Sequence, residues 1–209
     1  MKLCYLSWNT TQDLLHIVTL LKKNEVIVGA SDTILGLLAN VSLSAYKKLN
    51  DMKERADKPY IVLVPDLDTL KQLIKLPMRK DVDEMIKKFW PGPLTIIFHA
   101  ADTVPAHLAP GGKIGIRIPG HQGLLRILRE TGPLFSTSAN ITGKPVPKKV
   151  QEIDQMILAK VAAVVQADQE QAVPSTILDT TGEQLVIIRE GVISKNELKE
   201  FFLKDTKRC

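Results

Sequence analysis

The sequence predicts a protein of the α/β or α+β class built on a large twisted sheet. Short β-branched apolar segments alternate along the chain with segments whose apolar residues recur at the spacing of an α-helix. Several of the strand segments are nearly all apolar, as strands must be when helices cover both faces of their sheet. The 209 residues are enough for one domain around a single hydrophobic core. We therefore expect one domain over residues 1–209.

The elements follow one another in a regular order. The first helix is expected to begin at Thr10 or Thr11, because either side chain can cap it, and the residues from Leu14 to Leu21 form one apolar stripe. At least seven strands share a short, β-branched composition: residues 25–30, 60–64, 94–99, 114–118, 162–166, 175–179 and 184–189. The remaining helices share an amphipathic pattern: residues 43–53, 66–75, 79–90, 121–131, 148–160 and 195–203.

Composition excludes several classes of protein. Hydrophobic residues make up 44% of the chain and charged residues 24%, which is typical of a folded globular protein. No apolar run approaches the roughly 20 residues of a membrane span, and residues 1–8 lack the pattern of a signal peptide. We therefore expect a cytoplasmic protein without membrane contact. Two cysteines, Cys4 and Cys209, are too few for a disulfide framework or a zinc site.

The net charge of +5 is mildly basic. Lysines and arginines gather in residues 47–58, 144–149 and 204–208. Such groups favour encounter with polyanions, although charge runs are often only solvated surface, which is the better interpretation of the third group. Charge alone therefore does not establish nucleic-acid binding.

Two features of the expected sheet are typical of a ligand-binding site. Ser31-Asp32-Thr33 follows the strand at 25–30, where hydroxyl groups at the carboxyl end of a strand either bind a ligand or cap a following helix. Arg117 lies in the otherwise apolar segment 114–118. A buried arginine is either paired inside the protein or faces a cavity that holds an anion, and the sequence leaves both alternatives open.

Three further polar segments interrupt the apolar pattern. Residues 53–59 (KERADKP) bring Lys53, Arg55 and Lys58 into one loop, which suits a triphosphate. Residues 133–140 (PLFSTSAN) begin as an apolar strand and end in hydroxyl and amide groups that suit phosphate or carboxylate. A serine hydrolase is disfavoured, because this segment lacks G-x-S-x-G and no histidine is marked as its base.

The last polar segment is PSTILD at residues 174–179, which precedes the expected strand at 184–189. The turn between these strands predicts a hairpin that brings Ser175 and Arg189 to one rim. Neither the P-loop pattern nor G-x-G-x-x-G occurs, so a bound nucleotide would need a different set of contacts.

In this order, the segments resemble the YrdC/TsaC family of L-threonylcarbamoyladenylate synthases, over about residues 10–193. The matching segments are SDTILGL, KERADKP, WPGPLTIIF, IGIRIP, STSANITG, PSTILD and REG. The resemblance implies an α/β fold with a twisted mixed sheet, surrounding helices and a large concave basic cavity. It resembles the short form of the family, with only a helix and tail at residues 194–209.

The resemblance also implies roles for individual residues. L-Threonine contacts fall on Ser31, Thr33, Arg117, Ser136 and Ser175, and Arg117 is the natural partner of the carboxylate. The resemblance implies that seven residues contact ATP: Lys53, Arg55, Lys58, Lys113, Ser138, Asn140 and Arg189. Lys53, Arg55 and Lys58 are the implied catalytic residues. The loop between Arg55 and Lys58 is one residue shorter than the family pattern, which puts the position of Lys58 in doubt.

The implied activity joins L-threonine, bicarbonate and ATP into L-threonylcarbamoyl-AMP and pyrophosphate. A separate transferase complex then modifies the adenosine next to the anticodon of tRNA. Mg²⁺ would be held through the phosphates of ATP, since the sequence shows no carboxylate cage of its own. The alternative is a non-catalytic module for double-stranded RNA or tRNA. It fits the basic charge, but a protein that binds an RNA backbone would not need Arg117 and the STSAN and PST hydroxyl groups in apolar strands.

Overall fold

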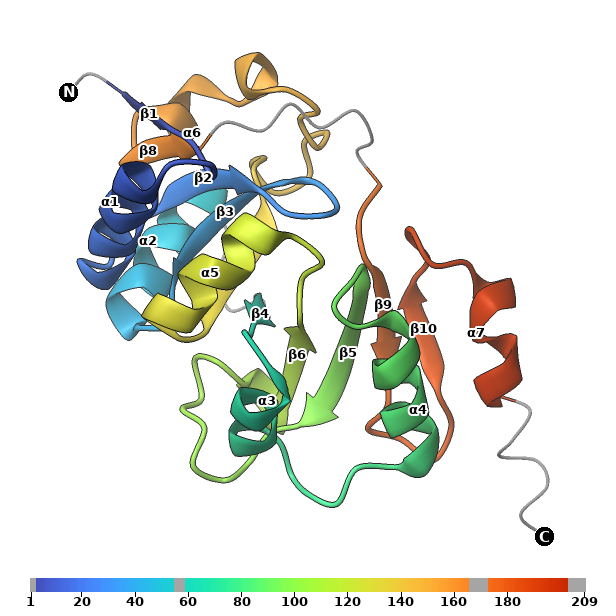
Figure 1. Cartoon of the computed structure of the whole chain (residues 1–209). Helices are drawn as coiled ribbons and strands as arrows, with labels where there is room; N and C mark the ends of the chain where they lie inside the picture. The colour runs from blue at the N-terminus through green and yellow to red at the C-terminus, as the bar shows by residue number, and fades with distance from the viewer. Residues whose placement is uncertain (1–2, 55–58, 166–172, 203–209) are drawn as a thin grey trace, which may run out of the picture.

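The computed structural model describes residues 3–54, 59–165 and 173–202. These residues form one ten-stranded sheet with helices packed around it (Figure 1). The strands are β1 (Cys4–Leu6), β2 (Ile27–Ala30), β3 (Leu35–Asn40), β4 (Ile61–Leu63), β5 (Leu94–His99), β6 (Lys113–Arg117), β7 (Leu134–Ser138), β8 (Ala163–Val165), β9 (Thr176–Asp179) and β10 (Val186–Arg189). The helices of four or more residues are α1 (Thr11–Lys22), α2 (Leu43–Lys53), α3 (Leu67–Leu73), α4 (Lys80–Phe89), α5 (Gln122–Thr131), α6 (Gln155–Leu158) and α7 (Lys195–Phe202).

The sheet is mixed, which confirms the predicted fold class. Its strand order is β1-β8-β2-β3-β7-β4-β6-β5-β9-β10. The pairs β1–β8, β2–β8, β4–β6 and β5–β9 are parallel, and the other neighbours are antiparallel. Segments far apart in the chain thus become neighbours, so the polar segments of the sequence can meet at the strand ends.

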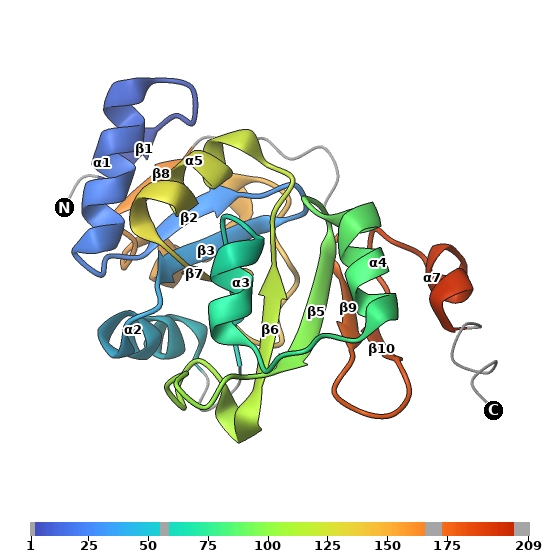
Figure 2. The ribbon, with the colours of Figure 1, turned by 60° about the horizontal axis from the view of Figure 1, so that its bottom comes forward.

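The helices begin where the sequence predicts a cap. The side chain of Thr10 accepts a hydrogen bond from the Asp13 N–H at 3.2 Å, and Ile17 and Leu21 of α1 are fully buried. Figure 2 shows α1 and α5 over β2 and β3, while α4 lies along β5 and β9. The last helix, α7, packs Phe201 against Phe89 of α4 with 6.1 Å between ring centroids. The expected C-terminal helix is therefore confirmed.

Two strands were not expected. β1 has three residues and pairs in parallel with β8, so its pattern is too short to stand out in the sequence. β3 follows the polar turn Ser31-Asp32-Thr33 and pairs antiparallel with β2. The interpretation of that turn as a helix cap is therefore wrong. β7 was expected only as an apolar strand start, and the structure extends it to Ser138.

The helix expected at residues 148–160 is also wrong in part. The structure has a short 3-10 turn at Val150–Glu152 and the four-residue helix α6. Between them, Ile153 is extended and buried, and Asp154 caps α6 by accepting a hydrogen bond from Met156 N–H at 3.0 Å. The apolar residues follow helical spacing, but the capping carboxylate restarts the helix in the middle of the segment.

One apolar core extends under the whole sheet, from Leu6 near the N-terminus to Phe201 in α7. In the part of the chain that the structure describes, no helix is both long and apolar enough to cross a bilayer.

Candidate functional site

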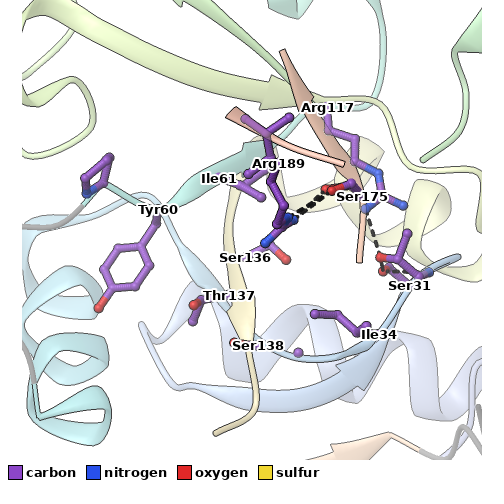
Figure 3. A pocket seen from close by; sticks show the side chains of 14 residues that line it. Ser31, Ile34, Tyr60, Ile61, Arg117, Ser136, Thr137, Ser138, Ser175 and Arg189 are labelled. Atoms are coloured by element: carbon purple, nitrogen blue, oxygen red, sulfur yellow. Dashed lines mark hydrogen bonds between the residues drawn. The ribbon is translucent and has the colours of Figure 1, made fainter. Parts of the chain in front are cut away.

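A cavity of about 240 Å³ opens where the ends of β2, β6 and β7 approach the β9–β10 hairpin (Figure 3). Its lining includes seven of the residues that the sequence singled out: Ser31, Thr33, Arg117, Ser136, Ser138, Ser175 and Arg189. These side chains come from segments of the chain that are separated by up to 158 positions (31 to 189). The cavity is therefore the candidate site.

The turn between β2 and β3 forms one wall. Ser31 and Thr33 are 7% and 3% exposed, and their hydroxyl oxygens lie 2.8 Å apart. The Thr33 N–H also donates to Ser31 Oγ at 3.3 Å, which fixes the turn. Both hydroxyl groups are thus held at the cavity by local hydrogen bonds.

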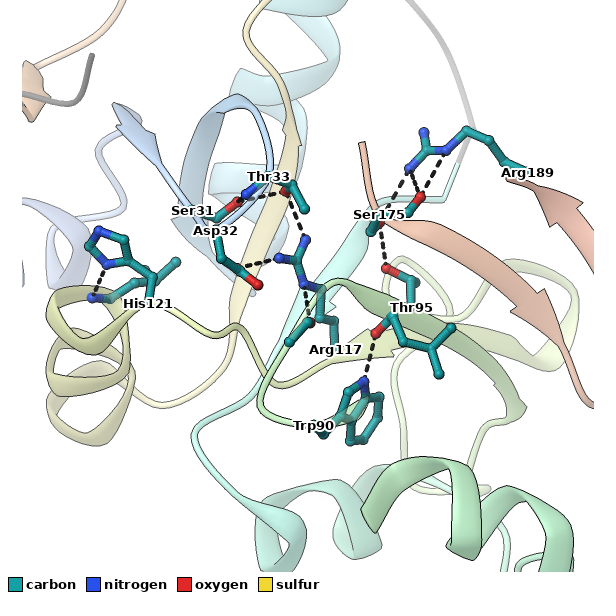
Figure 4. A network of polar contacts seen from close by, with 12 residues as sticks. Ser31, Asp32, Thr33, Trp90, Thr95, Arg117, His121, Ser175 and Arg189 are labelled. Carbon is teal, nitrogen blue, oxygen red and sulfur yellow. Dashed lines mark hydrogen bonds and ion pairs between the residues drawn. The ribbon is translucent and has the colours of Figure 1, made fainter. Parts of the chain in front are cut away.

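Arg117, at the end of β6, is buried in the wall beside this turn. Its Nε donates to the carbonyl oxygen of Gly92 and its Nη1 to Thr33 Oγ1, both at 2.9 Å, while Nη2 forms an ion pair with Asp32 (Figure 4). Burial lowers the pKa of Arg117, and the Asp32 carboxylate opposes this effect. The structure confirms that this arginine is paired internally, and it also places Arg117 in the lining of the cavity.

Three of the five guanidinium donors of Arg117 are used in these bonds. The remaining two have no hydrogen-bond partner among the described residues. Asp32 Oδ2, in contrast, is buried and has no hydrogen-bond partner among the described residues. It faces Gly120, where a β-carbon would come within 3.0 Å of it. Arg117 and Asp32 thus form a tightly enclosed pair in the wall.

The opposite wall is formed by the β9–β10 hairpin. Arg189 Nε and Nη2 donate to the Ser175 carbonyl oxygen at 3.1 and 2.8 Å, which confirms that the hairpin brings these residues together. Burial lowers the pKa of Arg189. Among the described residues no carboxylate pairs with Arg189, whereas Arg117 is paired with Asp32.

Lys53 lies behind the β7 end of the cavity. It is the last residue of α2, is only 2% exposed, and donates from Nζ to the Ser138 carbonyl oxygen at 2.7 Å. The same ammonium group contacts Asn140 through Oδ1 at 3.0 Å and through the carbonyl oxygen. Lys53 therefore shapes the loop that follows β7. Its expected companions Arg55 and Lys58 lie outside the described residues.

Two implied nucleotide contacts lie away from this cavity. Asn140 lines a second cavity of about 240 Å³, together with Lys144 and Asp154. Lys113 begins β6, at the end opposite to Arg117, and forms an exposed ion pair with Asp179 at 3.1 Å. Four residues of strand separate the two side chains by about 13 Å. The structure therefore does not bring Lys113 to the cavity.

Sequence reasoning missed the apolar part of the lining. This part of the lining is Ile34, Gly36, Pro59, Tyr60, Ile61 and Ile177, while Thr137 belongs to the hydroxyl-rich end of the STSAN segment. Ile61 was part of an expected strand, and its place is explained by its pairing with Ser136 on β7, which puts both side chains on one face. The strand pairing, which the sequence does not specify, was the missing signal.

Named relatives match most of the chain. It is 33% identical over 186 residues to a threonylcarbamoyl-AMP synthase of Bacillus subtilis, a match that covers 86% of this chain and 54% of that one. It is 31% identical over 180 residues to a protein of the same name from Shigella flexneri, covering 83% of this chain and 93% of the relative. The chain thus spans about half of the first protein and nearly all of the second.

A solved structure has the same fold. The Sua5 protein of P. abyssi, complexed with L-threonine, superposes with a TM-score of 0.88 at 24% identity. The superposition covers 96% of this chain and 61% of that one. The family model for Sua5, YciO and YrdC, described as telomere recombination, matches residues 19–191. These residues contain every polar segment that contributes to the cavity, and the chain therefore belongs to the Sua5/YciO/YrdC family.

Proposed function

We propose that this chain joins L-threonine, bicarbonate and ATP into L-threonylcarbamoyl-AMP, with release of pyrophosphate and water. One observation carries the proposal: the cavity brings together two arginines and six serine and threonine side chains from segments that lie far apart in the chain. Arginine and hydroxyl donors in a half-enclosed cavity are suited to a small substrate that carries several oxygen atoms. The names of the relatives and the threonine complex of the P. abyssi protein support the same reaction.

L-Threonine would bind between the two walls of the cavity. Its carboxylate would accept hydrogen bonds from the two unused donors of Arg117, which the pair with Asp32 holds in one orientation. Hydroxyl groups of Ser31, Thr33, Ser136 and Ser175 would contact the rest of the amino acid. The walls would thereby fix the amine for the first step.

In that step the threonine amine attacks bicarbonate, a C–N bond forms, and water leaves to give a carbamate. A carbamate oxygen then attacks the α-phosphate of ATP, and the bond to the departing pyrophosphate breaks. The protein would contribute by holding both reactants in line and by stabilising negative charge on the phosphates. Arg189 suits this task, because no described carboxylate balances its charge.

The triphosphate would extend toward Lys53 at the end of α2. Lys53, Arg55 and Lys58 are the proposed cations, with Ser138 and Asn140 as nucleotide contacts. Lys53 supports this arrangement, since its ammonium group holds Ser138 and Asn140 in place. Lys113 is left out because it lies at the far end of β6.

Mg²⁺ is the proposed cofactor and would be held by the phosphate oxygens of ATP, where it neutralises charge on pyrophosphate. The donor set of this chain fits that mode of binding. Asp32, the carboxylate next to the cavity, is engaged with Arg117, and the described residues contain no group of three histidine, cysteine or acidic side chains that could hold a metal ion. The protein residues would therefore bind the nucleotide rather than the ion.

The product would pass to a tRNA threonylcarbamoyl transferase complex for modification of adenosine next to the anticodon. Pyrophosphate release tests the proposed function directly. We expect release with ATP, Mg²⁺, L-threonine and bicarbonate, and only background release when L-threonine or bicarbonate is left out. An Arg126→Ala variant, changed on the exposed side of α5, serves as a control and should retain the activity. ATP cleavage that does not depend on L-threonine would contradict the proposal.

A further inference from the structure

We propose that Thr95 of β5 is a positioning residue that sets the direction of the Ser175 O–H bond, so that Ser175 donates a hydrogen bond into the cavity. The acceptor would be an oxygen atom of bound L-threonine. This inference rests on the proposed function and adds a residue outside the cavity lining that controls one of its donors.

The two side chains are enclosed together. Thr95 is 1% exposed and Ser175 is 2% exposed, and their hydroxyl oxygens lie 2.9 Å apart (Figure 4). The parallel pairing of β5 with β9 sets this distance, since Thr176 N–H donates to the Pro93 carbonyl oxygen at 3.1 Å. Ser175 lines the cavity, whereas Thr95 does not appear in its lining.

The hydrogen atoms can be assigned from the contacts. Arg189 Nη2 lies 3.2 Å from Ser175 Oγ and can only donate, so it occupies one acceptor position of the serine oxygen. If Ser175 donated to Thr95, the hydroxyl hydrogen of Thr95 would be buried without an acceptor, because Ser175 is its only side-chain partner among the described residues.

If Thr95 donates to Ser175 instead, every hydroxyl hydrogen of the pair can reach an acceptor. Thr95 donates to Ser175 Oγ, which then accepts from both Thr95 and Arg189. The Ser175 hydrogen is left to point into the cavity, where a ligand oxygen can accept it. Ser175 is thereby converted from a group that could donate or accept into a fixed donor.

The orientation of Thr95 is itself constrained. Its γ-methyl group lies beside Gly115 of β6, where a β-carbon would be 3.7 Å from it. A β-branched side chain has few χ1 positions in a strand, so the contact with β6 turns the hydroxyl group toward Ser175. Because Gly115 has no side chain, the methyl group of Thr95 fits beside it without a steric clash.

The test measures L-threonine binding by calorimetry with Thr95→Val, which removes the hydroxyl group, and with Thr95→Ser, which keeps it. We expect Thr95→Val to weaken binding about three- to tenfold, the effect of one neutral hydrogen bond. Thr95→Ser should bind nearly as well as the wild type. Thr180→Val is the matched control, because Thr180, which follows β9, also makes a hydroxyl hydrogen bond to β5, to the Ile97 carbonyl oxygen at 2.8 Å.

A double-mutant cycle distinguishes an effect of Thr95 on the Ser175 hydroxyl group from a general destabilisation of the sheet. If Thr95 acts through Ser175, Thr95→Val should have no further effect on binding in a Ser175→Ala background. Unchanged binding by Thr95→Val, or an equal loss in both backgrounds, would overturn the inference while the wild type still binds L-threonine. If the wild-type protein does not bind L-threonine, the proposed function fails first and the inference fails with it.

Discussion

Arg117 and Asp32 depend on one another, because each is enclosed by the protein. The arginine side chain is 4% exposed and the aspartate side chain is 16% exposed. A buried ion pair adds little stability over an apolar pair, but removal of one member leaves the other charged and unpaired. Asp32 therefore contributes to the site without facing the cavity.

We predict that Asp32→Ala lowers the free energy of unfolding by about 3 to 5 kcal/mol, because Arg117 loses its only anionic partner among the described residues. Urea denaturation would measure the change. Asp32→Asn should lose less, since the amide oxygen still accepts from Arg117. A loss below about 1 kcal/mol for Asp32→Ala would contradict this role, as that is the size expected for an exposed pair.

We predict that Arg117→Ala weakens L-threonine binding by on the order of 2 to 4 kcal/mol, because a charge-assisted contact to the carboxylate is lost. ATP binding should change less. Calorimetric titration of the folded variant would measure both, with Arg126→Ala as a matched arginine control on the exposed face of α5. Affinity within twofold of the wild type would remove Arg117 from the threonine site.

At the scale of elements, the pairing of β3 with β7 depends on a glycine. Gly36 pairs with Ser138, and a β-carbon on it would lie 2.9 Å from the Thr137 carbonyl oxygen. Because Gly36 also lines the cavity, the missing side chain keeps both the strand pair and the adjacent space intact. This strand needs glycine for close approach to its neighbour.

We therefore predict that Gly36→Ala destabilises the protein by about 1 to 3 kcal/mol, the usual cost of forcing a group into a packed site. Gly115→Ala is the control in the same sheet, since its β-carbon would meet side-chain atoms at 3.7 Å or more, an ordinary contact. Thermal unfolding of both variants gives the comparison. Equal melting temperatures would show that β3 moves to admit the methyl group.

The start of α3 makes stability depend on pH. Asp66 caps this helix, and hydrogen bonds from Thr69 N–H and from its hydroxyl group lower the pKa of the Asp66 carboxyl from 3.8. A lowered pKa in the folded state stabilises the protein above the unfolded pKa, and this contribution is lost as the pH falls through the folded pKa. The cap therefore weakens only in acid.

We predict that Asp66→Ala costs about 1 kcal/mol at pH 7, the usual value of a helix cap. The difference from the wild type should shrink as the pH falls below 3.8. Asp66→Asn keeps a capping oxygen without the titration, so its stability should follow a flatter pH curve. Denaturant titrations at several pH values measure this, and a difference that stays constant into acid would show that the carboxylate charge has no part in the cap.

At the scale of the whole molecule, the net charge of +5 is compatible both with an enzyme that binds ATP and with a protein that binds RNA. An experiment must therefore distinguish the two. We predict that pyrophosphate release needs L-threonine and bicarbonate but proceeds without tRNA. Binding of tRNA should be weak and should fall steeply with salt, because only backbone charge would be contacted. Release assays with and without tRNA at two salt concentrations would test this. An absolute requirement for tRNA, or tight salt-independent binding without turnover, would favour the RNA-binding alternative.

Much of this molecule could be predicted from local patterns. The strand at Leu94–His99 and the helix at Leu43–Lys53 have the expected bounds, because their periodicity is strong and continuous. β1 and β3 were missed because three residues show no periodicity and because an all-apolar strand after a polar turn also fits a helix. The distance of Lys113 from the cavity could not be predicted either, because the sequence places this residue on a strand without saying which end of the strand faces the cavity.

The parallel pairing of β1 and β2 with β8 also bears on how the chain is made. Leu6 pairs with Val165 and Ile27 with Ala163. Strands β1 and β2 therefore cannot pair with β8 until more than 130 further residues have been synthesised. During translation, the outer edge of β2 and the whole of β1 remain unpaired until residue 165 has left the ribosome. Open strand edges promote association between nascent chains, and long-range pairings form slowly. The N-terminal edge should therefore be the part of this protein that most needs protection by chaperones during its synthesis.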